Sequence, residues 1–328
     1  MLRNVRLIAS VFMLLNAPSV WSASAPVQMR LLYPSFAGSW ATSWIAREAG
    51  YFSNEGLDVE LVRVGGSSRM VAAMLGGSAP IIQAGAIAAI TANVAGSDVV
   101  IIGATGSVSP FRLIARPEIK QMAELKGKKA GITTFGSTSD QVVRIALKHF
   151  NLEPNKDVAI LPFGAQPEAF AALANGAVQV AALSYPLYAK AQKMGMRELV
   201  AFSDLGVEDI NGTVITTRTY LAQNRDIALR FMRAFTRAIH RYRTDKEFSK
   251  KVLAKYGKLT DDDILEGTWQ DYAPTLQKSP RPSLKAIQFM VADQYAGKKP
   301  LPKPEQFVDL SIAEQLEKSG FVDSVNKQ

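Results

Sequence analysis

The sequence contains no cysteine among its 328 residues. Disulfide bonds, thiolate catalysis, cysteine-based metal sites and a lipid anchor on an N-terminal cysteine are therefore excluded. Histidine is nearly absent too: His149 and His240 lie within predicted helices beside basic residues, and we interpret both as surface positions. The chain has no nucleophile elbow, paired metal-binding histidines, Walker loop or dinucleotide fingerprint. We predict a protein that is not an enzyme and that carries no metal or cofactor.

Long hydrophobic runs are also missing, apart from one short stretch at the N-terminus. Arg3 and Arg6 precede an apolar run from Leu7 to Leu15, and small residues follow as far as Ser22 and Ala23. This pattern is typical of a signal peptide, and the apolar run is too short to cross a bilayer. We predict that residues 1–23 are a signal peptide cleaved near Ser22-Ala23, and that the mature protein is soluble and periplasmic.

Charge of one sign is not concentrated anywhere in the chain. The 38 Lys and Arg residues exceed the 29 Asp and Glu residues, but they are scattered rather than grouped, and no nucleic-acid-binding motif is present. We interpret the net charge of +9 as a solvated surface with a mild bias toward anions. We expect a monomer with no nucleic-acid partner, and a length that one hydrophobic core rarely holds, which favours two domains.

Short apolar runs alternate with helical periodicity from Val27 to about Ile215. This alternation is typical of parallel, doubly wound α/β sheets. The predicted strands are Met29-Tyr33, Leu57-Val64, Ile81-Ala84, Val99-Gly103, Lys129-Ile132, Val158-Leu161 and Val178-Leu183, and the helices between them include Ser39-Ala49, Ser67-Leu75, Ser137-Phe150 and Pro167-Ala174.

An internal repeat at an offset of 99 residues links the two halves of this region. The segment from Leu61 to Gly77 runs beside the segment from Ile160 to Gly176, and both read as strand, glycine turn, amphipathic helix and glycine C-cap. The same offset pairs residues 33–39 with residues 132–138. The repeat predicts two lobes with the same order of strands and helices, although the strand–helix alternation common to all α/β proteins would give a similar pattern.

Helices without strands are predicted beyond Thr217, so this C-terminal region should pack on the existing lobes. The predicted helices are Asp226-Arg243, Lys246-Tyr256, Asp261-Tyr272 and Ser283-Tyr295. Residues 110–116 and 210–217 are then the expected crossings between lobes. We predict a first lobe from residues 24–110, a second lobe from 111–212, and a return to the first lobe with the C-terminal helices over 213–328.

Ligands of doubly wound sheets bind outside the carboxyl ends of the strands, where loops lead into helix N-termini. The loops at those positions are rich in glycine, serine and threonine. The candidate ligand-binding residues are Ser35, Phe36, Gly38, Trp40, Gly66, Ser67, Ser68, Arg69 and Gly85 in the first lobe, and Gly136, Ser137, Thr138, Ser139 and Tyr185 in the second.

The sharpest of these loops is the segment Gly136 to Asp140, where a helix is predicted to start. Free N–H groups and hydroxyls at a helix N-terminus suit an oxyanion, whereas an ordinary N-cap would explain the same residues. Trp40 and Tyr185 are placed to cover a flat part of a ligand, or to pack in the core. Arg69 could pair with a ligand anion, or be a solvated helix residue.

A family resemblance follows from four segments of the chain. The run from Trp44 to Glu60, the run from Glu124 to Gly131, the Gly136-Ser137-Thr138 turn, and Ala172-Leu173 with Gly176 together resemble the periplasmic binding proteins for nitrate, taurine and aliphatic sulfonates. The resemblance implies a type II periplasmic binding protein: two α/β lobes closing on a small polar or anionic ligand, then docking to an ABC-type permease with its cytoplasmic ATPase.

Two alternatives stay open within this resemblance. Some relatives bind pyrimidine precursors of thiamin, and some eukaryotic relatives synthesise that pyrimidine with pyridoxal phosphate, although their cysteine-rich signature has no counterpart here. A sensory binding protein would hold the same ligand but dock on a membrane receptor. Neither the identity of the ligand nor the choice between permease and receptor follows from the sequence.

Overall fold

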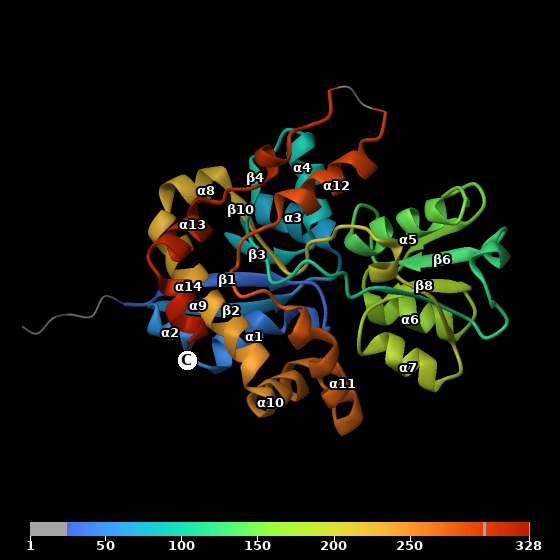
Figure 1. Ribbon diagram of the computed structural model, residues 1–328, viewed down its shortest axis with the longest axis horizontal. Coiled ribbons are helices and arrows are strands. Elements are labelled where there is room, and N and C mark those ends of the chain that lie inside the picture. The colour runs from blue at the N-terminus through green and yellow to red at the C-terminus, as the bar shows by residue number, and fades with distance from the viewer. Residues whose placement is uncertain (1–24, 298–299, 328) are drawn as a thin grey trace, which may run out of the picture.

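A computed structural model describes residues 25–297 and 300–327, and it has two α/β lobes lying side by side (Figure 1). The predicted signal peptide lies outside the described residues. Each lobe is built on one sheet, and the C-terminal helices wrap the lobe that contains the start of the chain. None of the helices in the described part of the chain is long and apolar enough to cross a membrane.

The sheet of lobe 1 has the strand order β2-β1-β3-β10-β4. Strands β1, β2 and β3 are parallel, and β10 is antiparallel to both of its neighbours. Helices α3, α4 and α12 pack on one face of the sheet, whereas α1, α9 and α10 belong to the core on the other face. The strands are β1 (Val27–Tyr33), β2 (Leu57–Arg63), β3 (Ile81–Ala84), β4 (Val99–Gly103) and β10 (Thr213–Thr217). The helices are α1 (Ala41–Glu48), α2 (Tyr51–Asn54), α3 (Ser67–Leu75), α4 (Ala86–Val94), α8 (Arg218–Gln223), α9 (Arg225–Thr244), α10 (Lys246–Gly257), α11 (Asp262–Tyr272), α12 (Leu284–Gln294), α13 (Ser311–Lys318) and α14 (Phe321–Asn326).

The sheet of lobe 2 has the order β7-β6-β8-β5-β9, with β5 antiparallel to β8 and β9. Helix α5 covers one face, and α6 and α7 cover the other. The strands are β5 (Arg112–Ala115), β6 (Lys129–Ile132), β7 (Ala159–Pro162), β8 (Val180–Leu183) and β9 (Arg197–Ala201), and the helices are α5 (Thr138–His149), α6 (Gln166–Ala174) and α7 (Leu187–Lys193).

The two sheets are mixed rather than parallel, which corrects the sequence-based expectation. Residues 110–116 and 210–217 were expected to cross between the lobes. Most of the first segment forms β5, and most of the second forms β10. Each of these strands is inserted at the fourth position of its sheet, between strands formed by other parts of the chain. The chain therefore enters lobe 2 through β5 and returns to lobe 1 through β10, and the crossings themselves lie just before these two strands.

The internal repeat corresponds to a structural repeat of the lobes. Helix α3 (67–75) and helix α6 (166–174) have equal lengths and differ by 99 residues, as do β3 (81–84) and β8 (180–183). The strand orders also match, with the inserted antiparallel strand in the same place. Two similar lobes facing each other bring equivalent loops together across the space between them.

The C-terminal helices pack against existing cores and have no sheet of their own among the described residues. Helix α9 contributes Phe231, Phe235 and Tyr242 to the core beneath α1, and all three side chains are fully buried. Helix α11 extends from lobe 1 toward lobe 2, where the Tyr272 hydroxyl donates to the carbonyl oxygen of Tyr185 at 2.9 Å. This region therefore completes lobe 1 and also forms one wall of the space between the lobes.

Candidate functional site

The cleft between the lobes contains two adjoining compartments. The inner one holds about 30 Å³ and lies where helices α3, α5 and α6 begin. The outer one holds about 260 Å³ and opens beside α7. Ser35 and Gln166 line both compartments, so a molecule bound in one reaches the other. The inner compartment is lined by Pro34, Ser35, Trp40, Gly66, Ser67, Phe111, Thr133, Ser137, Thr138, Ser139 and Gln166.

Three hydroxyls from lobe 2 form the floor of the inner compartment. The side-chain oxygens of Thr133, Ser137 and Ser139 lie 2.9 Å from one another, and the Ser139 hydroxyl also accepts from the Thr133 N–H at 2.9 Å. Ser137 is the N-cap residue of α5, yet its side chain makes no capping hydrogen bond. The ordinary N-cap explanation therefore does not account for this hydroxyl, which is buried and faces the cleft.

Lobe 1 and helix α6 supply further donors to the compartment. The Ser67 hydroxyl accepts from the Gly85 N–H at 3.0 Å, and the Ser35 hydroxyl accepts from the Ala37 N–H at 3.3 Å, which leaves the hydrogen of each hydroxyl free. The Gln166 carbonyl oxygen accepts from both the N–H and the hydroxyl of Ser184, each at 2.9 Å. The amide NH₂ of Gln166 is therefore the part of this side chain that can donate into the cleft.

The inner compartment is consequently rich in hydrogen-bond donors and has no formal charge. Neither a cationic nor an anionic side chain is among its described lining residues. The first N–H groups of α3 and α5 add donors, because the first turn of a helix has no internal acceptors for them. Such an arrangement suits an acceptor-only ligand group, and an oxyanion is the acceptor-only group that gains most from aligned N–H and O–H dipoles.

Glycines at the mouth allow the lobes to touch. A Cβ atom added at Gly85 would overlap the Thr138 hydroxyl, and one added at Gly66 would lie 2.6 Å from the Thr134 methyl group. The Ser68 hydroxyl donates to the Phe135 carbonyl oxygen across the cleft at 2.9 Å. The structure is therefore in a closed arrangement in which loops of the two lobes meet.

The outer compartment has a different chemistry. Its walls are mostly apolar and come from both lobes, and Tyr185 and Phe36 contribute rings to it. The lining residues are Ser35, Phe36, Ala37, Gln166, Pro167, Ser184, Tyr185, Pro186, Leu187, Lys190, Gly257 and Leu259. Burial raises the pKa of the Tyr185 hydroxyl, so this side chain is neutral at physiological pH. The compartment suits the apolar part of a ligand whose polar group lies in the inner one.

The predicted ligand-binding residues fall into three groups. Ser35, Phe36, Trp40, Gly66, Ser67, Ser137, Thr138, Ser139 and Tyr185 line one or both compartments. Ser68, Gly85 and Gly136 lie at the lobe contact rather than in the lining. Gly38 is elsewhere, since a Cβ there would overlap Tyr272 of α11, and packing explains it. Arg69 is exposed, with its guanidinium beside Gly164 of lobe 2, so it lies at the edge of the lobe contact and not in the lining.

Thr133 and Gln166 are the polar residues of the inner compartment that the candidate set does not include. Nothing in the sequence shows that Ser184 turns the Gln166 amide toward the cleft. One further correction concerns His240, which is half-buried rather than a plain surface residue, with its Nδ1 unpaired. Among the described residues, no group of three or more His, Asp or Glu side chains could hold a metal ion.

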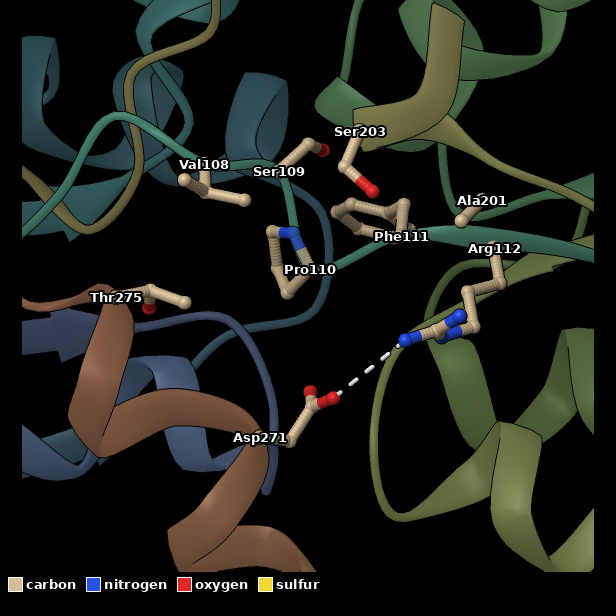
Figure 2. Close-up of a pocket in the computed structure, with 9 residues that line it drawn as sticks. All are labelled: Val108, Ser109, Pro110, Phe111, Arg112, Ala201, Ser203, Asp271 and Thr275. Carbon is tan, nitrogen blue, oxygen red and sulfur yellow. Dashed lines mark ion pairs between the residues drawn. The ribbon is translucent and has the colours of Figure 1, made fainter.

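A third cavity of about 120 Å³ lies at the crossings between lobes (Figure 2). Phe111 lines both this cavity and the inner compartment. Arg112 and Asp271 face each other here at 3.8 Å, and Asp271 also accepts from the Tyr188 hydroxyl at 2.6 Å. Burial raises the pKa of Asp271 even though Tyr188 and Arg112 oppose this shift. These contacts join α11 of lobe 1 to β5 and α7 of lobe 2.

Asp209 is a fully buried carboxylate in the second crossing. It accepts from the Ile210 N–H at 2.8 Å, and the Ser109 hydroxyl of the first crossing lies near it without a well-formed hydrogen bond. Burial raises the pKa of Asp209 to about 6. Because the folded pKa exceeds the unfolded value, ionising this group destabilises the fold, and the loss grows as pH rises from about 4 to about 6.

Replacing Asp209 with Asn is therefore expected to stabilise the protein at neutral pH. The gain is about 3 kcal/mol at most near pH 8, since two pKa units correspond to about 2.7 kcal/mol, and it falls below about 1 kcal/mol near pH 4.5. The Asn side chain can still accept from Ile210 and can donate to Ser109. Thermal unfolding of both proteins across this pH range measures the effect; equal pH dependence of the two curves would contradict the assignment.

Comparisons with known proteins agree with this architecture. The chain is 22% identical to YtlA of Bacillus subtilis (strain 168), whose name includes the words binding protein, over 321 residues covering 94% of this chain and 96% of that protein. The structure matches the alkanesulfonate-binding protein SsuA from Xanthomonas axonopodis pv. citri bound to MOPS with a TM-score of 0.71 at 21% identity, covering 88% of this chain and 100% of that chain.

Two further structures show the range of functions found on this fold. The ligand binding component of an ABC-type import system from Staphylococcus aureus, with zinc bound, matches with a TM-score of 0.73 at 16% identity, covering 88% of this chain and 98% of that one. The desulfurization enzyme DSZB matches with a TM-score of 0.63 at 13% identity, covering 89% and 99%. The fold therefore supports both binding and catalysis, and the site decides between them.

The family model described as NMT1/THI5 like matches residues 39–246, which is more than half of the chain. The resemblance inferred from the run at residues 44–60 and the Gly136-Ser137-Thr138 turn is thereby confirmed, as is the two-lobed fold. The chain belongs to the NMT1/THI5-like family and has the type II periplasmic binding protein fold.

Proposed function

We propose that this protein is the periplasmic solute-binding component of an ABC-type importer that captures a small oxyanion of the sulfonate, taurine or nitrate kind. The observation that carries the proposal is the inner compartment, where uncharged hydroxyl, amide and backbone donors converge without a charged side chain. The likeness to an alkanesulfonate-binding protein and to a component of an ABC-type import system supports it. The ligand would pass unchanged to a membrane permease with its cytoplasmic ATPase.

Opening and closing of the lobes would control access to the site. The inner compartment is small, about 30 Å³, and is lined by loops of both lobes, so a ligand would enter it only when the lobes separate. The hydroxyls of Ser67 in lobe 1 and Ser137 in lobe 2 would then donate to the same oxyanion. Because the bound ligand contacts both lobes, it favours the closed state, whose surface the permease would recognise.

Methanesulfonate is expected to bind more tightly than hydrogen methylphosphonate at about pH 6. The two anions have similar shape and charge, but the phosphonate retains one P–OH group, and no carboxylate among the described lining residues of the compartment can accept from it. An unsatisfied buried donor costs about 1–3 kcal/mol, which corresponds to a preference of about 5- to 150-fold. Isothermal titration of the mature protein with both compounds measures the ratio.

Two further measurements on the same protein and ligand serve as controls for the titration. Solution scattering should show compaction on addition of methanesulfonate, and mass spectrometry should recover the compound intact. Equal affinity for both anions would contradict the donor-rich description of the site. Absence of binding by methanesulfonate, taurine and nitrate together would exclude the proposed ligand class.

A second candidate is the binding of a neutral pyrimidine precursor of thiamin. Trp40 in the inner compartment and Tyr185 in the outer one are placed to cover a flat ring, and ring nitrogens would accept from the same donors. Titration with aminopyrimidines distinguishes this candidate. A sensory role predicts the same affinities, with a receptor in place of a permease as the protein that co-purifies.

Catalysis by this site is the remaining alternative. Its serines have no histidine, lysine or carboxylate beside them among the described lining residues of the inner compartment, so none is placed to be activated as a nucleophile. A product detected by mass spectrometry after prolonged incubation with a bound sulfonate would overturn the binding-protein proposal.

A further inference from the structure

Two exposed lysines lie at the outer compartment, one from each lobe. Lys190 of α7 lines the compartment directly. Lys258 follows α10 between the lining residues Gly257 and Leu259, and its ammonium lies 5.9 Å from the centre of the Phe36 ring, which also lines the compartment. Arg63 lies over the same ring at 4.8 Å. Positive charge therefore borders the mouth of an otherwise apolar space.

These lysines differ from their neighbours in having no carboxylate partner within the described part of the chain. Lys193, three residues beyond Lys190, pairs with Asp261 at 3.1 Å, and Lys255, three residues before Lys258, pairs with Glu48 at 2.8 Å. Neither Lys190 nor Lys258 has an ion pair of this kind among residues 25–297 and 300–327. Their charge is available to a ligand.

The carboxylates that act electrostatically on the lining residue Tyr185 are those of Asp271, Asp261 and Asp263, and the first two are engaged elsewhere. Asp261 is held by Lys193 and by the Ile264 N–H, and Asp271 faces Arg112 and Tyr188. The walls between the two lysines are apolar, with Pro167, Pro186 and Leu187 on one side and Leu259 on the other. The middle of the compartment is therefore lined by apolar side chains, and its open end is bordered by positive charge.

We propose that the preferred ligand has a second anionic group, joined to its oxyanion head by an apolar spacer about one aromatic ring long. The head would lie in the inner compartment, which rests on the function proposed above, and the second group would lie between Lys190 and Lys258. A cavity of about 150 Å³ accommodates benzene, so about 260 Å³ holds a ring with one substituent. A distal anion between lysines of different lobes would also favour closure.

The test compares 4-sulfobenzoate with 4-carbamoylbenzenesulfonate, which have the same size and differ in the charge of the distal group. An exposed ion pair contributes up to about fivefold in affinity, so two lysines are expected to give a preference of about tenfold for the dianion at low ionic strength. The preference should fall several-fold in 0.5 M salt, since both lysines are exposed. Calorimetric titration of the mature protein measures both affinities.

Substitution assigns the preference to these two lysines. In the K190M/K258M variant, the ratio of the affinities for the dianion and for the uncharged amide should fall from about tenfold to about one. The control is Lys251→Met, which removes an exposed lysine of α10 that does not line the compartment. Single K190M and K258M variants should each lose part of the preference, which guards against a folding defect in the double variant.

The outcomes separate this proposal from the one on which it rests. The proposal of a ligand with two anionic groups is overturned if methanesulfonate binds but neither aromatic sulfonate does, or if 4-sulfobenzoate binds no more tightly than the amide. The oxyanion site is unaffected by either result. If methanesulfonate, taurine and nitrate all fail to bind, the proposed function fails, and terephthalate against 4-carbamoylbenzoate makes the same charge comparison with a carboxylate head. Absence of a preference there as well overturns the lysine-bordered subsite.

Discussion

Replacement of Gln166 by Glu is expected to abolish oxyanion binding while leaving the fold intact. Gln166 presents its NH₂ group to both compartments because Ser184 occupies its carbonyl oxygen. A carboxylate at this position can still accept from Ser184, so the local structure should be retained. It removes two donors and adds a negative charge beside the anion, and two charges about 4 Å apart interact by about 4 kcal/mol at an effective dielectric constant of 20.

The expected loss is therefore at least about a thousandfold in the affinity for methanesulfonate, measured by calorimetry. Gln223→Glu is the matched control, because Gln223 is exposed at the end of α8 and the substitution makes the same change in net charge. Thermal unfolding of both variants should stay close to that of the unmodified protein. An affinity of the Gln166→Glu variant within tenfold of the unmodified protein would show that Gln166 does not face the ligand.

The predicted elements are most accurate where local sequence alone determines them. Helix α3 and strands β3, β4 and β6 have the predicted bounds, because each is an apolar run with turn residues before and after it, and α3 has a pair of glycines at each end. Strands β5, β9 and β10 were not expected. Each has five residues or fewer, and each pairs with strands from distant parts of the chain. Their pairing is a tertiary property that no local pattern reports.

The same division applies to the candidate site. The rule that ligands bind at the carboxyl ends of strands places the loops of Ser35, Ser67 and Ser137 correctly at the cleft. It does not reveal which atoms point inward. Gln166 becomes a donor because of a residue 18 positions later, and Gly38 is required by α11, more than 220 residues away. Orientation of a side chain depends on such partners, so the sequence predicts loops better than it predicts atoms.

Replacement of Gly85 by Ala is expected to prevent complete closure of the lobes. The backbone of Gly85 has φ −75° and ψ 137°, which alanine adopts without strain, so lobe 1 should fold normally. Within lobe 1 the new Cβ atom would lie 3.2 Å from the Ser67 hydroxyl, which a shift of a few tenths of an ångström relieves, whereas its overlap with the Thr138 hydroxyl of lobe 2 arises only when the lobes meet. A ligand would then contact the donors of one lobe. Loss of two hydrogen bonds to an anion, each contributing about 1.5–3 kcal/mol, predicts a decrease in affinity of more than about a hundredfold.

A second substitution distinguishes blocked closure from a general defect. Thr138→Ala removes the overlapping hydroxyl, and the closest remaining atom of this residue, its Cβ, lies 3.3 Å from the new Cβ position. The G85A/T138A variant should therefore recover most of the affinity of T138A alone, and scattering should again show compaction with methanesulfonate. G85A alone should show neither the recovered affinity nor the compaction. If G85A binds and compacts like the unmodified protein, the contact between Gly85 and Thr138 is not part of the ligand-bound state, and the lobes close on the ligand in a different relative orientation.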